Sequence, residues 1–551
     1  MDYKKAVEDK EREWTDLYTR MDEDKGLIYL DSYKMEDLNK RKVPNVINVT
    51  LNDPAVFAAN VESSLGSAVE QITVETEDKK IDTAYIEDFL KAAFSSANAL
   101  LAKQDRGPLN PFFDQQMCRR GRGAARCTFR MENGVLIPEI VPTDTRYFVY
   151  EFKEDGLAWT GFRTTKPKVW VEEKYKGVVV AGKEAKMLDI WTPDHFEIYV
   201  SDRKVYEEEH DYGYVPFGVQ TVPLGSMLQD SDALTHRGES IFFLIRDLIP
   251  EMNRLASILQ TLNMETIKNA MQWKTRTGEG ERMPTHEQLT ALGGMTAAEI
   301  GGGAEPIRIE DVRRAAQMLH SIIETRIQRG SLTSIDLGTL QFPLSAVALV
   351  ELGEGRDQVF LPRLGSRGLL NQQIAEMIIE QVIPMGSVEL GTKGHKRTFD
   401  TSKLRGEYEI TFKYFIKSPK IDIARYSIAN AADPELISQR TKRRDIIQMQ
   451  DPDGEEAQLY WEQAGRESIL VRRRRIIESL IKQGNDVEAE LMSAELGLTA
   501  KQMIAGQMPQ MPQEKRPRPE SLLPLMAQGG PRRSAKKAAE LEATPREETE
   551  E

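Results

Sequence analysis

The closest match to a catalytic motif is the segment GVVVAGKE at residues 177–184. Gly177, Gly182 and Lys183 have the spacing of a phosphate-binding loop. The match fails at Glu184, because its carboxylate stands where a Ser or Thr hydroxyl would bind magnesium and would repel a phosphate. The three valines between the glycines also favour a strand over a phosphate cradle. A degenerate nucleotide-binding enzyme is therefore only a rival hypothesis.

The sequence shows no local metal-binding or acid–base motif. Its histidines form no HxxxH or HExxH pair, although a metal site assembled from residues far apart stays open. Asp230 and Asp232 precede a long helical pattern, where paired carboxylates are typical of helix capping or solvation. Cys118 and Cys127 lack CxxC spacing, so we expect free thiols in a reducing compartment. We expect no enzyme, no cofactor and no metal ion.

Two basic clusters, residues 440–444 and 472–475, are candidates for contact with nucleic-acid phosphates. A few cations on an acidic body would guide DNA without holding it tightly. The alternative interpretation is two solvated helix faces, and no interleaved aromatic residues indicate base stacking. The candidate DNA contacts are Arg443, Arg444, Arg472 and Arg473.

Composition and charge limit the possible classes of protein. The chain has 551 residues, of which 40% are hydrophobic and 29% charged, with a mean hydropathy of -0.48. This composition predicts globular domains, roughly three to four in number. Apolar runs are far too short for a membrane span, and the acidic N-terminus has no signal-peptide core, so we expect an intracellular protein. The net charge of -13 has the wrong sign for a protein that wraps DNA.

The elements that would position these residues suggest an α+β chain. Residues 46–66 form an apolar stretch with a helix-start signal at Asn52, Asp53 and Pro54, followed by a strand-like segment, EQITVETED. Residues 85–104 have a helical pattern. Residues 128–206 alternate apolar and polar side chains around Asn-Gly and Asp-Gly turns, which predicts a strand-rich lobe. Residues 406–415 also alternate, and we expect them to form a strand that returns to this lobe.

A long helix is predicted for residues 239–270, where apolar residues recur in steps of four and three. At about 1.5 Å per residue it would be on the order of 48 Å long, with a bend at Pro250, which lacks a hydrogen-bond donor. Polar residues on both sides of the seam favour packing against neighbouring helices, although a buried core helix would show the same repeat. The seam consists of Ile241, Ile245, Leu248, Met252, Leu255, Leu259 and Leu262.

A second helix, residues 310–330, follows a glycine-rich excursion, so the two helices would form a protruding arm. Residues 330–345 are too long for a simple connection. The pattern over residues 346–383 predicts a helix interrupted around Gly353, Gly355 and Pro362. Short helices are expected up to residue 498, and the proline-rich residues beyond 506 indicate disorder.

This order of parts resembles the portal, or head-to-tail connector, proteins of tailed bacteriophages. The resemblance covers roughly residues 45–498 and rests on the succession of elements, because no segment is a short invariant signature. It implies a ring of twelve subunits around an axial channel. The segments that carry it are NVINVTLNDPAVFAANVESSLGS, VPTDTRYFVYEF, HRGESIFFLIRDLIPEMNRLASILQTLNMETIKNA, GSLTSIDLGTLQFPLS and LPRLGSRGLLNQQIAEMIIEQV.

The resemblance also implies a division of the chain into named parts. These are the N-terminal part of the wing at residues 1–237 with its β-rich lobe at 128–220, a first stem helix at 238–270, a clip at 271–310, a second stem helix at 311–330, a tunnel loop at 331–345, a long wing helix and returning strand at 346–440, a helical crown at 441–498 and a tail at 499–551.

Two of these parts would carry functional residues. The tunnel loop would line a DNA channel with Thr333, Ser334, Asp336, Thr339 and Gln341. The clip would dock partner proteins through Trp273, Arg276, Arg282 and His286.

The implied function is packaging and ejection of double-stranded DNA at a capsid vertex of a virion assembled in the host cytoplasm. The implied partners are further copies of the chain, a terminase packaging motor, head-completion or tail adaptor proteins, and the major capsid and scaffolding proteins. An acidic channel would repel DNA and so lower friction during translocation. The main rival is a non-phage oligomeric scaffold or adaptor protein.

Overall fold

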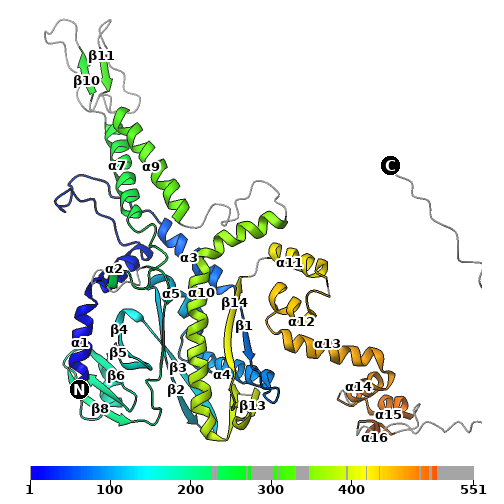
Figure 1. Cartoon of the computed structure of the whole chain (residues 1–551). Coiled ribbons are helices and arrows are strands. Elements are labelled where there is room, and N and C mark those ends of the chain that lie inside the picture. Colours follow the sequence, from blue (N-terminus) through cyan, green and yellow to red (C-terminus); the bar gives the residue numbers. More distant parts are fainter. Residues whose placement is uncertain are drawn as a thin grey trace, which may run out of the picture. The chain divides into compact units, whose positions relative to one another are not determined.

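The computed structural model (Figure 1) describes most of the chain. The described residues are 2–132, 134–225, 230, 233–268, 271–274, 303–306, 310–330, 346–392, 395–416, 419–433, 435–482, 485–494 and 499–504. The chain divides into two compact units, residues 1–457 and 458–551. The expected α+β class is confirmed, because helices accompany sheets whose strand pairs are almost all antiparallel. None of the described helices has the length and apolar composition of a membrane span.

Two five-stranded sheets form the strand-rich lobe of the first unit. The first has the order β13-β12-β3-β2-β9, and the second the order β4-β5-β6-β7-β8. The strands of the first are β2 (Arg122–Glu132), β3 (Val135–Thr143), β9 (Phe217–Thr221), β12 (Ser387–Thr392) and β13 (His395–Asp400). The strands of the second are β4 (Phe148–Lys153), β5 (Gly156–Pro167), β6 (Glu184–Trp191), β7 (His195–Val200) and β8 (Arg203–Glu209).

Helices cover these sheets and bury their apolar faces. Trp14 is almost fully buried between α1 (Tyr3–Glu13) and α2 (Thr15–Ile28), and its ring packs edge-on against Tyr150 of the second sheet. A larger core lies between the first sheet and α3 (Asp53–Gly66), α4 (Thr83–Lys103) and α5 (Leu109–Arg119). Asp82 caps α4 by accepting a hydrogen bond from the Tyr85 N–H, which satisfies one of the free donors of the first turn.

The segments between residues 168 and 183 differ from the expected strand. α6 (Lys168–Lys174) is followed by a loop in which Val180 is buried and donates its N–H to Glu172. The prediction of a strand at residues 178–180 is therefore wrong, because Val178 and Val180 pack individually against the second sheet while Val179 is exposed.

The returning strand is present but pairs elsewhere. β14 (Glu409–Ile416) pairs antiparallel with β1 (Ala68–Glu75) in a two-stranded sheet of its own. It therefore does not join the strand-rich lobe as expected. Alternation along a strand fixes which side chains share a face, but it does not specify the partner strand.

The arm consists of α7 (Leu248–Lys268) and α9 (Glu310–Gly330), with strands β10 (Met271–Lys274) and β11 (Gly303–Pro306) beyond them. Figure 1 shows the two helices side by side, projecting from the sheets. The prediction that the first helix begins near Glu239 is wrong, because α7 begins at Leu248. Pro250 cannot donate a hydrogen bond to the Arg246 carbonyl, so a helix begins readily around it but does not extend regularly backwards through it.

The long helix α10 (Ala346–Val382) is continuous, so the predicted interruption is wrong. Pro362 lies inside it, and the Pro362 carbonyl accepts a hydrogen bond from the Ser366 hydroxyl. Figure 1 shows the helix changing direction along its length, as expected for a helix with an internal proline. Packing against β2, β9 and β14 holds the C-terminal part of α10 in place.

Short helices form the rest of the chain. α11 (Pro419–Ala431) and α12 (Gln439–Thr441) belong to the first unit. α13 (Pro452–Glu467) spans the division between the units, which falls before Gln458. The second unit continues with α14 (Ile469–Lys482), α15 (Asp486–Ala494) and α16 (Ala500–Ile504), around a small core of Ile477, Ala489 and Ala500.

Candidate functional site: the junction at the base of the arm

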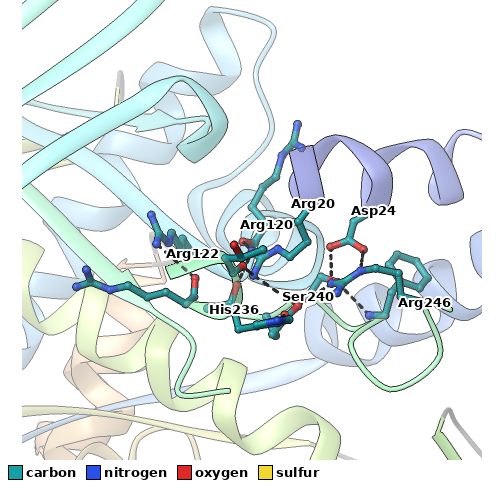
Figure 2. A network of polar contacts seen from close by, with 12 residues as sticks. Arg20, Asp24, Arg120, Arg122, His236, Ser240 and Arg246 are labelled. Atoms are coloured by element: carbon teal, nitrogen blue, oxygen red, sulfur yellow. Dashed lines mark hydrogen bonds and ion pairs between the residues drawn. The ribbon is translucent and has the colours of Figure 1, made fainter. Parts of the chain in front are cut away.

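A buried network of charged residues connects the arm to the body of the first unit. Its residues come from α2, from residues 120–122 between α5 and β2, and from residues 233–247, which lead into α7 (Figure 2). The segments that contribute them are more than 90 residues apart in sequence, so only folding brings them together. This junction determines how the first arm helix leaves the body.

Glu239 is the central acidic group of the junction, with a fully buried side chain. It accepts hydrogen bonds from Arg246 Nη2 at 2.6 Å and from His236 Nδ1 at 2.7 Å, and it lies 3.5 Å from Arg20. Burial alone would raise the pKa of Glu239, but the hydrogen bond from Arg246 and the charge of Arg20 outweigh burial and lower it. Glu239 is therefore held as a carboxylate among cations.

Arg246 ties the start of the arm to helix α2. It forms a two-pronged ion pair with Asp24, at 2.7 Å and 3.0 Å, and Asp24 is fully buried. Although burial opposes the charged form, the hydrogen bonds to Asp24 and Glu239 hold the pKa of Arg246 above its usual value. Two-pronged pairs of this kind fix orientation as well as distance.

Arg20 and Arg120 bind the backbone of the same region. Arg20 donates to the carbonyls of Thr235 at 2.7 Å and Gly238 at 2.8 Å. Burial is the main cause that lowers the pKa of Arg20, to about 10. Arg120 donates to the carbonyl of Met21 at 2.7 Å. The bonds of Arg20 fasten the irregular chain before α7 to α2, and the bond of Arg120 fastens α2 to the end of α5.

Arg122 is the most deeply buried cation of the junction. It is 1% exposed, its guanidinium lies 4.8 Å from the ring centre of Trp14, and it donates to the Arg237 carbonyl. Burial lowers the pKa of Arg122. The aromatic face supplies part of the stabilisation that a carboxylate would otherwise provide.

Two glycines allow the backbones to meet at this point. Gly121 and Gly238 both have positive φ values, 71° and 75°. A Cβ at Gly121 would lie 1.9 Å from the Gly238 carbonyl oxygen, and one at Gly238 would lie 2.6 Å from the Gly121 oxygen. No larger residue fits at either position without moving the backbone.

The predicted seam residues fall into two groups. Met252 and Leu255 are buried against Ala316 and Ile323 of α9, with Leu248 and Leu259 partly buried beside them, as expected for two packed helices. Ile241 and Ile245 belong to the core of the body instead, because they lie in turns before the helix. Leu262 is half-buried.

The two basic clusters belong to different compact units. Arg443 and Arg444 belong to the first unit, where they lie 3.2 Å from Glu456 and 3.3 Å from Glu75. Carboxylates thus already neutralise both. Arg472 and Arg473 lie on α14 of the second unit, where Arg472 is exposed and Arg473 half-buried.

The remaining predicted site residues lie largely outside the described part of the chain. This holds for all five tunnel-loop residues and for Arg276, Arg282 and His286 of the clip. Trp273 is placed in β10, opposite Ala304 of β11.

One possible metal-ligand set is His195, Glu197 and Glu207, whose ligand atoms lie within 4.8 Å of one another. Lys204 Nζ lies 2.8 Å from a carboxylate oxygen of each glutamate. An ammonium group thus already supplies the positive charge that a metal ion would bring.

Two further features bear on enzymatic chemistry. The loop with phosphate-binding spacing leads into strand β6, whereas a phosphate-binding loop leads into a helix N-terminus. A cleft of about 1290 Å³ lies between the two five-stranded sheets. Its lining includes Arg126, Lys174, Asp189 and Trp191, so charges of both signs mix with aromatic rings and no single class of ligand is favoured.

Sequence reasoning missed the junction. Its visible signal was the segment RRGRG at residues 119–123, in which arginines alternate with glycines inside otherwise apolar surroundings. The partners of these arginines could not be read from the sequence, because the carbonyls that Arg120 and Arg122 bind belong to Met21 and Arg237, each about 100 residues or more away.

No family model matches this chain, and no curated protein sequence matches it. Among solved structures, the chain is similar to one in the virion of a native gene transfer agent particle, with 12% identity, a TM-score of 0.37, and coverage of 71% of this chain and 88% of that one. It is also similar to one in the neck of an empty gene transfer agent particle, with 13% identity, a TM-score of 0.35 and the same coverage. These scores are too low to assign a function, which has to be inferred from the arm, the junction and the charge of this chain.

Proposed function

We propose that the chain is a portal subunit, which forms a ring at one capsid vertex and surrounds the channel for packaging and ejecting double-stranded DNA. The observation that carries the proposal is the arm. α7 and α9 pack on each other through Met252, Leu255 and Ile323, yet Met318 and Ile322 of α9 are 63% and 56% exposed. An apolar flank on a projecting helix pair calls for further copies of the same element.

The junction supports the same proposal. A ring of stems requires that every copy hold its arm at the same angle to its body. The two-pronged Arg246–Asp24 pair and the buried Glu239 supply this rigidity at the base of α7. Burying charged groups carries a desolvation penalty, and an arm that served only as a flexible tether would not need a network that fixes its orientation.

The net charge suits a channel that DNA passes without binding. Each copy carries -13, so a ring of copies would be strongly negative. A negative channel disfavours condensation of the duplex on its wall and lowers friction. The work of packaging would come from a separate motor protein, so we propose no enzymatic activity for this chain.

The parts of the chain receive their roles under this proposal. α7 and α9 form the stem, and the segment between them forms the clip, which docks the terminase motor and later the head-completion or tail proteins. Residues 331–345 form the tunnel loop, α10 lies in the wing, and residues 441–498 form the crown. Capsid and scaffolding proteins would contact the outer wing in the virion.

The clip assignment has its own test. Deletion of residues 278–303 should leave the wing folded, because the described body core contains none of these residues. The deletion should abolish motor or tail attachment in a packaging reaction. Normal packaging and tail joining by the deletion variant would refute the assignment.

The ring itself is tested by native mass spectrometry and electron microscopy of the purified chain. A closed ring with an axial channel supports a portal. A non-phage scaffold or adaptor predicts some other assembly, and a nucleotide-binding enzyme predicts specific binding of ATP or GTP, which the portal proposal does not.

A further inference from the structure

An extended segment is bound along the first arm helix by an unusual set of hydrogen bonds. The N–H groups of Ile47, Val49 and Leu51 donate to the side chains of Thr261, Ser257 and Asn253, at 3.0, 2.8 and 2.9 Å. Every second residue of the segment thus binds every fourth residue of α7.

The two spacings match for a geometric reason. Two residues of extended chain advance about 6.4 to 6.8 Å, and four residues of helix advance about 6.0 Å. The hydroxyls of Ser257 and Thr261 also donate to the helix carbonyls four residues earlier, each at 2.7 Å. Their oxygens therefore remain available to accept from the extended segment.

This segment is the returning side of a longer loop, residues 31–51, which we call the tongue. The outgoing side of the loop binds the returning side. The Tyr33 N–H donates to Thr50 Oγ1 at 2.9 Å, and the Met35 N–H donates to Asn48 Oδ1 at 2.7 Å. Leu38 at its tip is fully exposed. The tongue is thus a hydrogen-bonded loop that lies along α7.

Leu51, the last residue of the tongue, packs against the cluster that joins α7 to α9, whereas the hydrogen bonds of the tongue are made on the other side of α7. At about 100° per residue, the side chains of Asn253, Ser257 and Thr261 lie roughly 170° around the helix from the seam of Met252, Leu255 and Leu259. Figure 1 shows the tongue, the blue loop, on the side of α7 away from α9. The arm is therefore a row with the tongue at one end and α9 at the other.

Both ends of this row carry exposed apolar side chains. On α9 these are Met318, Leu319 and Ile322, with 63%, 45% and 56% exposure, and they lie roughly 100° around the helix from the seam. On the tongue, Ile47 is 37% exposed in addition to Leu38. Two different apolar surfaces at opposite ends are what a head-to-tail ring contact requires.

We propose that the tongue of one copy packs on the flank formed by Met318, Leu319 and Ile322 of the next copy. The tongue is then part of the subunit interface of the stem, and the bonds to Asn253, Ser257 and Thr261 position it for that contact. The inference rests on the proposed ring and specifies which surfaces close it.

Cross-linking between copies tests this contact. One variant carries Lys34→Cys, at an exposed position on the outgoing side of the tongue. The other carries Ile322→Cys on the α9 flank. Cys118 and Cys127 are fully buried, and burial raises the pKa of each to about 12, so they give little background. A short bismaleimide is used, because a disulfide would require Cα atoms within about 7 Å.

The two variants are assembled together and treated with the cross-linker. A linked dimer should appear in denaturing gels only when both variants are present, because neither carries both reactive positions. The matched control replaces Ile322→Cys with Glu324→Cys, an exposed position about 200° further around α9. This control should give at least fivefold less dimer.

The possible results separate the tongue contact from the portal proposal. Intact rings without the dimer, or with equal dimer from the Glu324→Cys control, would overturn the tongue contact and leave the portal proposal standing. Failure of the unmodified chain to form any ring would overturn both.

Discussion

Replacement of the buried Glu239 by glutamine should destabilise the junction strongly. The variant keeps the shape of the side chain and removes its charge, so Arg20 loses the carboxylate 3.5 Å away while Arg246 retains Asp24. Removing one partner of a buried ion pair typically costs 3–5 kcal/mol. Because the amide oxygen still accepts a hydrogen bond, we expect about 3 kcal/mol for Glu239→Gln, at the lower end of that range.

The assay is urea unfolding followed by tryptophan fluorescence, which reports on the buried Trp14 beside Arg122. With a slope of about 3 kcal/mol per molar urea, the loss corresponds to a midpoint shift of roughly 1 M. The matched control is Asp9→Asn, which breaks the exposed pair with Arg12 and should cost less than about 1 kcal/mol. A shift for Glu239→Gln no larger than that of the control would refute the structural role of the network.

The pH dependence of the same variant gives a second check. Because the pKa of Glu239 is lowered in the folded chain, its contribution is complete above the unfolded pKa of about 4.3. It is lost as the pH falls through the lower folded pKa. The unmodified chain should therefore lose its advantage over Glu239→Gln only below about pH 4.3.

Three further outcomes are expected. The two native cysteines should resist a thiol reagent at pH 8 in the folded chain and react fully in denaturant, because burial raises the pKa of both to about 12; rapid labelling of the folded chain would contradict their placement. Ser257→Ala should speed hydrogen exchange at the Val49 amide about fivefold, as the loss of one bond worth about 1 kcal/mol predicts; unchanged exchange would mean that the tongue is not held there. Thr333→Lys together with Thr339→Lys should slow DNA packaging at low salt, with partial recovery as added salt screens the new attraction to phosphate. Unchanged packaging at every salt concentration, in intact rings, would show that residues 331–345 do not face DNA.

The sequence pattern predicted the arm because its periodicity is long and local. The steps of four and three from Leu248 to Leu259 correspond to the surface that α7 presents to α9. The same pattern failed at Ile241 and Ile245, which lie in turns of the body core. The spacing of apolar residues indicates which side chains are buried, but not the backbone structure that buries them. A series of compact turns can bury side chains at the same intervals as a helix.

The helix-breaking residues of α10 led to a wrong prediction. Gly353, Gly355 and Pro362 predicted an interruption, yet the helix is continuous. Tertiary packing overrides local propensity there, because Phe360 and Leu364, on either side of the proline, are buried in the body core.

The junction and the tongue could not be predicted from local patterns. The Arg246–Asp24 pair joins residues 222 positions apart, and no periodicity encodes such a contact. A weak signal for the tongue did exist, because Asn253, Ser257 and Thr261 place small polar groups at steps of four on an apolar helix. Such a stripe predicts a hydrogen-bonded partner, but it does not identify residues 47–51 as that partner.

The central claim is tested most directly by imaging the purified full-length chain and measuring its native mass. The account predicts closed rings with an axial channel in top views and a mass near twelve times 62.5 kDa, with the twelvefold number taken from the resemblance to portal proteins. A stable, folded monomer across micromolar concentrations, with no rings in any view, would contradict it.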